Sequence, residues 1–513
     1  MLRVPRIAPR EVVFSAMMLA IFIVAVEATI VATALPTIVA DLGGLRYFSW
    51  VFGSYLLTQA VTIPIYGRLA DFFGRKALLI VAVVVFLIGS ILCGFAHSMF
   101  ALILFRALQG IGAGGVQPVS TTIVGDLYQG RDRARVQGYL STAWAFAAVI
   151  GPLLGAFLIA HFGWPIIFWI NVPVGLACIA VVLRAYHETI ARVAHRIDYL
   201  GSALLTLGIG TLMYVLVDLG NMAPLTATLL ALGGVAVLAL LLWHETRAPE
   251  PMMPLVLYRI RVIAVANAGN VFIGAMVMGI TAFMPTFVQG ALGAPAVAAG
   301  SVLGAFFVGW TCGSIGGARL QLRHSYRTIA CLGALPLLGG STLIAMLHAG
   351  SSIANVYAGL AFLGLGFGTF NSIFVVSTQG AVAWEMRGAA TSSLIFMRQI
   401  GQAVGTAAFG AIFNIGIYSR LADASGVMAQ LVDPARRGLI PQLDLARDAD
   451  AVAQSLHGVY LIALLLAVAI SALALALPPQ LRSGIAVARP SANGTSNTPG
   501  EPGARGERVG HEA

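Results

Sequence analysis

Apolar residues follow one another along almost the whole chain in runs of about 20, each long enough to cross a bilayer as an α-helix. Short polar connections separate these runs. We place fourteen spans, at residues 13–35, 48–69, 77–97, 100–125, 137–160, 165–184, 199–218, 225–244, 263–289, 297–319, 327–348, 353–380, 388–413 and 455–477. The pattern therefore predicts an all-α polytopic membrane protein.

The composition strengthens this prediction. Of the 513 residues, 59% are hydrophobic and 10% are charged, whereas about a quarter of the residues of a soluble domain are charged. The first span is longer than the apolar core of a cleavable signal peptide, so we expect it to remain in the mature protein. The four cysteines and nine histidines show no metal-ligand or redox spacing, and we expect neither a metal nor another cofactor.

Basic residues lie mainly in every second connection, and this asymmetry predicts an orientation. Among the short connections of the other side, Arg46 is the only arginine or lysine. Cytoplasmic loops carry such an excess of arginine and lysine, so we expect a cell (inner or plasma) membrane with both termini in the cytoplasm. Topology explains the net charge of +10 better than nucleic-acid binding does. A twelve-span alternative requires that neither 199–218 nor 225–244 crosses the bilayer, yet both are long and apolar enough.

Two segments differ from the spans in composition. The connection at 414–454 has mixed charge and many alanines, which favours an extracytoplasmic loop with room for short helices. The residues at 479–513 are rich in Gly, Pro and Ser, and we predict a disordered cytoplasmic tail there.

Three ionisable residues lie deep inside predicted spans: Glu27, Arg106 and Arg398. A charged side chain at such depth costs about 2.5–3.5 kcal/mol and usually marks a function. Glu27 is the only deep carboxylate of the sequence. Burial disfavours the ionised form of a carboxyl group and a nearby cation favours it. A glutamate whose surroundings alternate between wet and dry can therefore take up and release a proton, although a purely structural ion pair is the alternative.

The fourth span places polar residues close to one helical face. Arg106, Gln109, Gln117 and Ser120 recur there at helical spacing. A guanidinium at this depth needs a partner, and Glu27 is the deep carboxylate available. We predict that the two side chains pair, and the alternative is that Arg106 bonds backbone carbonyls only.

The connection after the second span reads GRLADFFGRK, a tight charged turn that would serve as a positive-inside anchor. It also resembles the first-loop signature of the major facilitator superfamily. The residues in register with that signature are Gly67, Asp71, Gly74, Arg75 and Lys76. Phe72 stands where a cation is usual. The resemblance implies that this loop is a conformational switch, with Asp126 as a cytoplasmic partner of Arg75.

Further motifs resemble the 14-helix drug:proton antiporters of the same superfamily. The first-helix motif has Glu27 where Asp is commoner, and RALQGIGAG resembles a fourth-helix motif whose arginine is implicated in proton transfer. AVIGPLLGA resembles the fifth-helix antiporter motif, and FWINVPVG also matches the group. These last two motifs contain Gly151, Pro152, Gly155 and Asn171.

The resemblance covers residues 13 to about 478 and implies the fold of the major facilitators. We expect two six-helix bundles at 13–190 and 261–478, with two inserted spans within 191–260 and a cytoplasmic N-terminus at 1–12. Residues 316–327 (GGARLQLRHSYR) weakly resemble the first-loop signature at the matching point of the second half. Alternating access would rock the bundles around a cavity at the membrane midplane.

Polar residues of several spans are candidates for lining this cavity, with helix packing as the alternative for each. They are Gln109, Gln117, Asn171, Asn267, Asn270, Asn371, Gln379, Arg398 and Gln402. Arg398 differs from the others because its burial costs most. The second half has no deep acid, so neutral, monovalent or anionic compounds fit this cavity better than divalent cations.

These observations favour a monomeric transporter that exchanges protons for small hydrophobic or amphipathic compounds, as in multidrug efflux and antibiotic resistance. One alternative is an exporter of a specific solute such as a lipid, siderophore or amino acid. Another is a non-transporting sensor of the same fold. The sequence has no phosphate loop, nucleophile motif or metal cluster, so we do not expect an enzyme.

Overall fold

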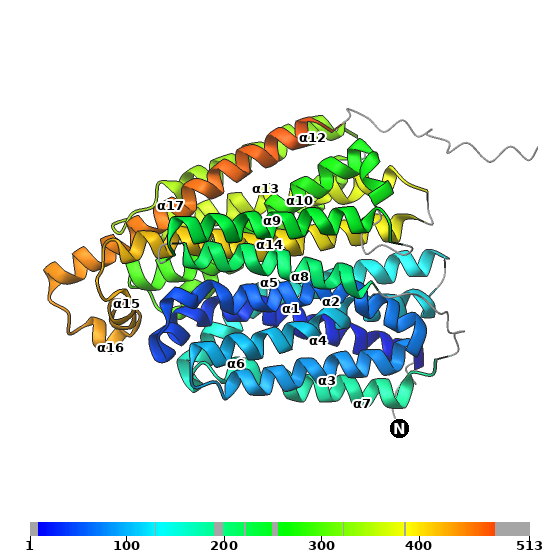
Figure 1. Ribbon diagram of the computed structural model, residues 1–513, viewed down its shortest axis with the longest axis horizontal. Coiled ribbons are helices and arrows are strands. Elements are labelled where there is room, and N and C mark those ends of the chain that lie inside the picture. The colour runs from blue at the N-terminus through cyan, green and yellow to red at the C-terminus, as the bar shows by residue number, and fades with distance from the viewer. Residues whose placement is uncertain are drawn as a thin grey trace, which may run out of the picture.

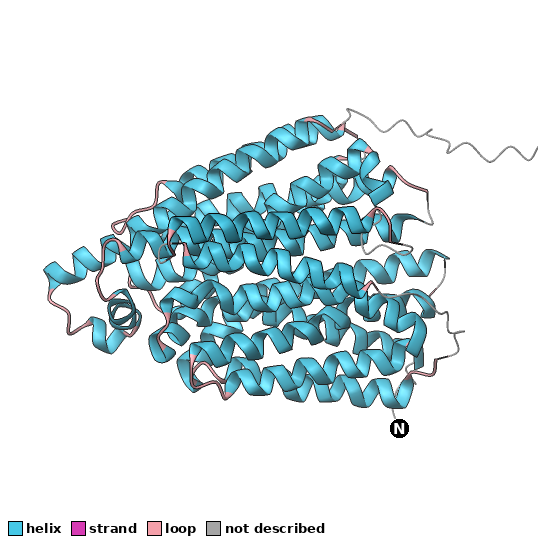
Figure 2. Ribbon diagram, viewed as in Figure 1, coloured by secondary structure: helices cyan, strands magenta, loops and turns pink. Residues whose placement is uncertain are grey.

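The computed structural model describes residues 9–128, 130–188, 198–219, 222–248, 255–321, 323–383 and 386–477. Every regular element in this part of the chain is helical (Figure 2). The elements are α1 (Pro9–Leu42), η1 (Leu45–Tyr47), α2 (Phe48–Phe73), α3 (Arg75–Gly94), α4 (Met99–Leu127), α5 (Gly130–Phe162), α6 (Ile166–Trp169), α7 (Asn171–Ala185), α8 (Tyr199–Asp218), α9 (Pro224–Glu245), η2 (Leu255–Arg259), α10 (Arg261–Thr286), η3 (Phe287–Ala291), α11 (Ala296–Leu320), α12 (Tyr326–Ala345), α13 (Ile353–Gly380), α14 (Arg387–Tyr418), α15 (Ala424–Val432), α16 (Pro434–Arg437) and α17 (Gln442–Leu475).

The membrane spans predicted from the sequence coincide with helices. Thirteen segments of the described residues are long and apolar enough to cross a membrane, and α6 and α7 together form one of them. The remaining predicted span falls on α5, whose described apolar part is Ile150–Phe162. The all-α polytopic fold is therefore confirmed.

Several helices extend beyond the apolar runs that predicted them. α1 continues through Pro36 to Leu42, since a proline is tolerated in membrane helices whose neighbours satisfy the freed backbone groups. α17 begins at Gln442, so the predicted 414–454 loop is shorter and contains α15 and α16. Side-chain contacts one turn apart stabilise this polar start of α17: Arg447 lies 3.7 Å from Asp444, and Gln454 donates to Asp450 at 2.6 Å.

The sixth predicted span is interrupted rather than continuous. α6 ends at Trp169 and α7 begins at Asn171, with Ile170 between them. Pro173 has no N–H group to donate to the carbonyl four residues earlier, that of Trp169, so the helical ladder breaks at this point. The break places Asn171 at the start of α7.

The helices form two groups with two helices inserted between them in sequence (Figure 1). α1 to α7 pack mainly on one another, as do α10 to α14 with α17. α8 packs against α9 and also against α2 and α14, one helix of each group. An ion pair between Arg46 of η1 and Asp218 of α8 ties the inserted pair to the first group.

The exact limits of the expected bundles, 13–190 and 261–478, remain predictions. The predicted tail at 479–513 lies outside the described residues, and so do residues 1–8 of the predicted N-terminal segment. The first connection between bundle and inserted pair is undescribed at 189–197.

The two bundles meet at the far face, which we define as the end where α1 reaches Leu42. α15 and α16 lie at this end, opposite the N-terminus (Figure 1). The ring of Phe48 lies 5.0 Å from that of Phe283, which lies 5.5 Å from that of Phe413. Every residue from 276 to 291 is buried. Aromatic and apolar packing between the bundles therefore closes the far face.

The N-terminal face, where α1 begins at Pro9, is less tightly joined. Residues 261–275 of α10 alternate between buried and partly accessible positions. The hydrogen bonds that the structure describes between the bundles lie at the far face or midway along the helices. They are Gln289 to the carbonyl of Thr33, Asn414 to the carbonyl of Arg46, and Gln399 to Gln59.

Candidate functional site

A buried ion pair lies in the middle of the first bundle. Glu27 of α1 is 0% exposed and Arg106 of α4 is 1% exposed. Arg106 Nη1 donates to Glu27 Oε1 at 2.6 Å, a short distance that is typical of a charge-assisted hydrogen bond. The structure thus brings together the two deep ionisable residues that the sequence placed in this half.

Asn171 binds the other oxygen of the carboxylate. Its Nδ2 donates to Glu27 Oε2 at 2.6 Å and to Ser90 Oγ at 2.9 Å. The break between α6 and α7 places this amide within reach of α1. Asn171 was predicted to line the cavity, but it is 3% exposed and belongs to the ion-pair network instead.

Gln109 and Ser90 complete this network. Arg106 Nη1 donates to Gln109 Oε1 at 2.6 Å, and Gln109 Nε2 donates to Ser90 Oγ at 3.1 Å. Ser90 in turn donates to the carbonyl of Phe168 at 2.7 Å. Gln109 is fully buried, so it too supports the ion pair rather than lining a cavity. Ser90 was not predicted from the sequence, although it is the only hydroxyl residue in the apolar run at 77–97.

α2 contributes an aromatic ring to the same site, and this contact was not predicted from the sequence. The guanidinium carbon of Arg106 lies 4.1 Å from the centre of the Tyr55 ring, within the range of a cation–π interaction. Arg106 Nε also donates to the carbonyl of Val51 at 3.2 Å. Among the described residues, the buried hydroxyl of Tyr55 has no hydrogen-bond partner. The guanidinium of Arg106 is thus held by four contacts, which come from α1, α2 and α4.

The glycines of the fifth-helix motif pack against the segment of α1 that carries Glu27. A Cβ atom on Gly151 would collide with the side chain of Thr29, and one on Gly155 would lie 2.6 Å from Ile30 Cγ1. Thr29 Oγ1 also donates to the carbonyl of Ala147 at 3.3 Å. The neighbouring Pro152 contacts Gly300 of α11 through its carbonyl. The motif thus holds α1 close to α5, next to the second bundle.

The first-loop residues surround the start of α3 at the N-terminal face. Gly74 has a φ of 97°, a region that favours glycine, and caps α3. The backbone N–H of Arg75 donates to Glu188 Oε1 at 2.7 Å, and that of Lys76 donates to Glu188 Oε2 at 3.3 Å. A carboxylate at a helix N-terminus is stabilised by the helix dipole. Glu188 was not predicted from the sequence, because it lies more than a hundred residues from Arg75 in the chain.

Side chains of this loop bind the ends of two other helices. Arg75 Nε lies 3.6 Å from Asp126 Oδ2, and Lys76 Nζ donates to the carbonyl of Tyr186 at 2.6 Å. Burial and the carboxylates of Glu188 and Asp126 raise the pKa of Tyr186 to about 12. A Cβ atom on Gly67 would meet nothing within 4 Å.

The Asp71 side chain, which was predicted to belong to the same switch, lies outside the described residues.

Some polar candidates of the second bundle are occupied in helix packing. Asn267 donates to Ser393 Oγ at 3.2 Å and Asn270 to the carbonyl of Ala266 at 2.9 Å. Gln379 donates to Thr391 at 3.2 Å. In this structure, these three side chains therefore take part in helix packing, which was the alternative to lining the cavity.

Other polar candidates are partly accessible and unoccupied. Within the described residues, the side chains of the four candidates named next form no hydrogen bond or ion pair. Each of the four keeps some accessible surface. The group consists of Gln117 of α4, Asn371 of α13, and Arg398 and Gln402 of α14. These side chains are available to a ligand.

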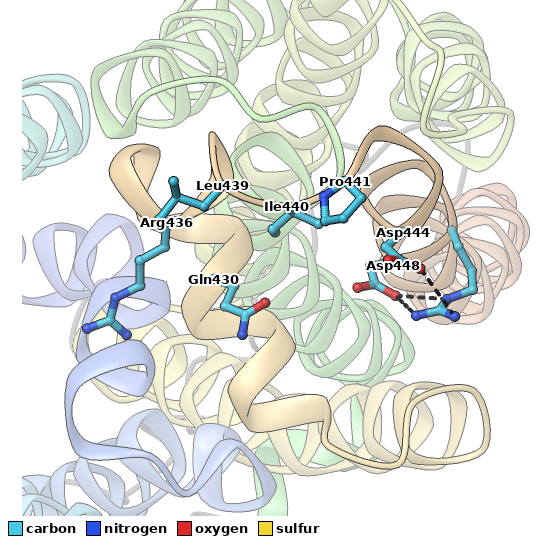
Figure 3. Close-up of a pocket in the computed structure, with 8 residues that line it drawn as sticks. Gln430, Arg436, Leu439, Ile440, Pro441, Asp444 and Asp448 are labelled. Carbon is cyan, nitrogen blue, oxygen red and sulfur yellow. Dashed lines mark hydrogen bonds and ion pairs between the residues drawn. The ribbon is translucent and has the colours of Figure 1, made fainter.

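A separate cavity of about 490 Å³ lies in the far-face loop, between α15 and the start of α17 (Figure 3). Its charged side chains pair with close neighbours in sequence: Arg447 lies 3.2 Å from Asp448 and 3.7 Å from Asp444. Close by, Arg437 donates to the carbonyl of Gly290 at 2.9 Å, and burial lowers the pKa of Arg437. The loop thus attaches to the end of η3, far from the buried ion pair.

The network around Glu27 surrounds an ionisable carboxyl group with hydrogen-bond donors. Both carboxylate oxygens accept hydrogen bonds, one from a cation and one from a neutral amide. Protonation of the carboxylate removes the charge that compensates Arg106. Because an uncompensated buried charge is costly, the protonated and deprotonated sites favour different arrangements of the helices that supply them.

Comparison with known proteins places this architecture in a family. The Major Facilitator Superfamily model matches residues 17–406. Multidrug resistance protein 3 of Bacillus subtilis (strain 168) is 31% identical over 477 residues, which cover 89% of this chain and 93% of that protein. The multidrug transporter protein MdtP of the same organism is 31% identical over 453 residues, covering 88% of this chain and 81% of its own.

Solved structures share the fold at low sequence identity. A bacterial homologue of the human lysosomal transporter Spinster, in an inward-facing and unoccupied conformation, superposes with a TM-score of 0.66 at 16% identity and covers 91% of this chain and 96% of its own. A D-xylose–proton symporter gives 0.58 at 12% identity, with 86% and 99% covered. The family model and the two Bacillus subtilis relatives establish that the chain belongs to the major facilitator superfamily, and the helical architecture is that of a multi-pass membrane transporter of this fold.

Proposed function

We propose that this protein exports small hydrophobic or amphipathic compounds in exchange for protons, by alternating access. The observation that carries the proposal is the fully buried carboxylate of Glu27, held by Arg106 at 2.6 Å and by Asn171 at 2.6 Å. The names of the two Bacillus subtilis relatives, a multidrug resistance protein and a multidrug transporter, support export of such compounds.

Proton exchange at Glu27 would couple to movement because the site joins several helices. α1 supplies the carboxylate, α4 the guanidinium, α7 the amide and α2 the aromatic ring. When Glu27 gains a proton, Arg106 loses its counter-charge and keeps its bonds to Gln109 and Val51. The electrostatic attraction between α1 and α4 then weakens. One proton moving down a potential of 100 mV supplies about 2.3 kcal/mol, enough to bias such an equilibrium.

The arginine-rich connections support a cytoplasmic N-terminal face, in a cell membrane with both termini inside. With this orientation, the aromatic contacts of Phe48, Phe283 and Phe413 close the extracytoplasmic side. The partly accessible residues of α10 at 261–275 belong to the side that admits substrate from the cytoplasm. Export then requires the far-face contacts to open and the N-terminal face to close. We propose that a monomer performs this cycle.

The cluster around Gly74 is the proposed switch at the cytoplasmic face. Glu188 binds the N-terminus of α3, and Arg75 approaches Asp126 at the end of α4. These contacts join α3, α4 and the end of α7 within one bundle. They stabilise the first bundle as a unit in the present conformation, and closing the N-terminal face would place the second bundle against them.

The decisive test is transport by Glu27→Gln in proteoliposomes. We expect the variant to fold with reduced stability, because glutamine keeps the size and the acceptor oxygen but not the charge that compensates Arg106. It should lose export driven by an imposed pH gradient. Asp41→Asn is the matched control, since Asp41 lies on the same helix and accepts from Trp164 Nε1 at 2.8 Å near the far face. The control should transport at the rate of the unmodified protein. Full pH-driven export by Glu27→Gln would refute the proposed proton site.

A further inference from the structure

Arg398 is a membrane-embedded cation that the proton site does not use. It lies within α14, in the apolar span at Ala390–Tyr418, and is partly accessible. In the sequence, every carboxylate except Glu27 lies near the end of a span or in a connection. Glu27 itself is already bound to Arg106. No described residue forms an ion pair or side-chain hydrogen bond with Arg398.

The packing of α14 shows which way Arg398 faces. Gly401 and Gly405 lie against α10, where added Cβ atoms would collide with Val271 and Ala275. Gln399 and Gly410 lie against α2, where they meet Gln59 and Ser49. Successive residues of a helix are about 100° apart.

Arg398 and Gln402 therefore occupy the face of α14 between its contacts with α10 and with α2. α10 belongs to the second bundle and α2 to the first, so this face is directed toward the junction of the two bundles. The Gln402 side chain is partly accessible as well and has no described partner. Gly274 of α10 packs against the backbone of Arg398 and Gln402, and Phe272, two residues earlier in α10, is a partly accessible aromatic residue.

From this placement we propose that Arg398 binds the negatively charged group of the transported compound, so that the protein exports amphipathic organic anions. A guanidinium presents a planar set of donors that matches carboxylate, sulfonate and phosphate oxygens. Gln402 adds an amide at one turn's spacing, and Phe272 offers an apolar surface. The proposal rests on the proposed export function and names its substrate class.

The test uses one dansyl fluorophore in three permanently defined charge states: the amides of taurine, ethylamine and 2-aminoethyltrimethylammonium. These probes carry a sulfonate, no charge and a quaternary ammonium. Their binding to purified protein is measured by fluorescence, and their transport is measured in phosphatidylcholine proteoliposomes under a pH gradient. Permanent charges prevent the passive accumulation that weak acids show under such a gradient.

We expect the unmodified protein to bind the sulfonate probe more tightly than the ammonium probe. Arg398→Gln should weaken sulfonate binding by about tenfold to a hundredfold, the range for losing a hydrogen bond to a charged group, and should leave the neutral probe unchanged. Arg398→Lys should restore part of the difference. Arg420→Gln is the matched control, because Arg420 is exposed in the turn just beyond the far end of α14 and should alter none of the three affinities.

Liposomes containing phosphatidylglycerol distinguish a soluble anion from a lipid headgroup. If the lipid phosphate occupies Arg398, it competes with the sulfonate probe in the unmodified protein and not in Arg398→Gln. Such competition would identify a lipid as the source of the anionic group, and its absence would favour soluble compounds. Both results retain anion recognition by Arg398.

The proposal is overturned if the unmodified protein does not prefer the sulfonate probe over the ammonium probe. It is also overturned if Arg398→Gln weakens all three probes equally, which would indicate a structural role. The proposed export function fails separately: its failure appears as absence of pH-driven transport of all three probes, whatever the binding preference.

Discussion

The two bundles differ in whether their deep arginine has a carboxylate partner. In the first bundle, Arg106 and Glu27 are almost completely buried. Arg106 donates to Gln109 and to the carbonyl of Val51, and Glu27 accepts from Asn171. In the second bundle, Arg398 keeps accessible surface and has no described carboxylate beside it. A charge that is neutralised internally can respond to a proton, whereas a charge left open can respond to a ligand. The difference suggests that proton coupling and substrate recognition are divided between the bundles.

The strongest test of this division compares the two arginines by stability. Arg106→Met should reduce the free energy of unfolding by about 3–5 kcal/mol, because it leaves the buried carboxylate of Glu27 uncompensated. It should also abolish pH-driven transport. Arg398→Met should leave stability unchanged or increase it, since it removes a charge without a partner. Chemical unfolding in detergent measures both.

The double variant Glu27→Gln/Arg106→Met provides the control for this comparison. It should recover most of the lost stability and none of the coupling, because it removes both charges together. Equal destabilisation by Arg106→Met and Arg398→Met would contradict the contrast between a paired and an unpaired arginine.

A smaller effect is expected at the helix contacts. Gly151→Ala should cost about 1–3 kcal/mol of stability, the usual price of overpacking, because its Cβ atom would collide with Thr29 beside Glu27. Gly316→Ala is the counterpart in the second bundle, where a Cβ atom would meet nothing within 4 Å. Its stability should be equal or slightly higher, since alanine favours a helix over glycine. Thermal unfolding together with transport assays checks both, and unaltered transport by Gly151→Ala would argue against tight α1–α5 packing as a condition for coupling.

The smallest effects are expected at the matching loops of the two halves. α3 is capped from a distance by Glu188, whereas α12 is capped locally by Ser325, which accepts from the N–H of Thr328 at 3.2 Å. Glu188→Gln should cost about 0.3–1 kcal/mol because a helix N-terminus favours negative charge. Ser325→Ala should cost about 1 kcal/mol through loss of the cap.

The two cap variants should differ in what else they change. Glu188→Gln should alter the balance between conformations, which cysteine accessibility at the N-terminal face measures, because Glu188 joins the end of α7 to α3. Ser325→Ala should leave that balance unchanged. A shift of equal size in both variants would mean that the first loop has no special role.

Much of the fold and the centre of the site follow from local sequence. The apolar runs located the helices because a helix in a bilayer must be apolar over about 20 residues. Glu27 and Arg106 were identifiable as partners because each is the only deep charge of its sign in the first half. The polar residues of α17 were assigned to a loop, because the hydropathy pattern does not detect a helix that continues beyond the bilayer.

The surroundings of these residues depended on contacts between distant segments. Ser90 and Tyr55 are ordinary residues in sequence, and they reach the buried ion pair only when α3 and α2 pack beside it. Glu188 likewise reaches the first loop only when the end of α7 packs against the start of α3. Gln109 and Asn171 have the same polarity as Gln402, yet the first two are buried in the network and the third keeps accessible surface. Polarity alone cannot separate these roles.

The sequence by itself determined that this protein is a helical membrane protein, where its spans lie and which deep charges need partners. It could do so because each polar residue placed in hydrocarbon adds its own free-energy cost, whatever its distant neighbours are. The tertiary structure decided which charge is neutralised and which stays open, and at which face the bundles meet. Those properties depend on the distance and orientation of side chains that are far apart in the chain, and helix packing alone sets them.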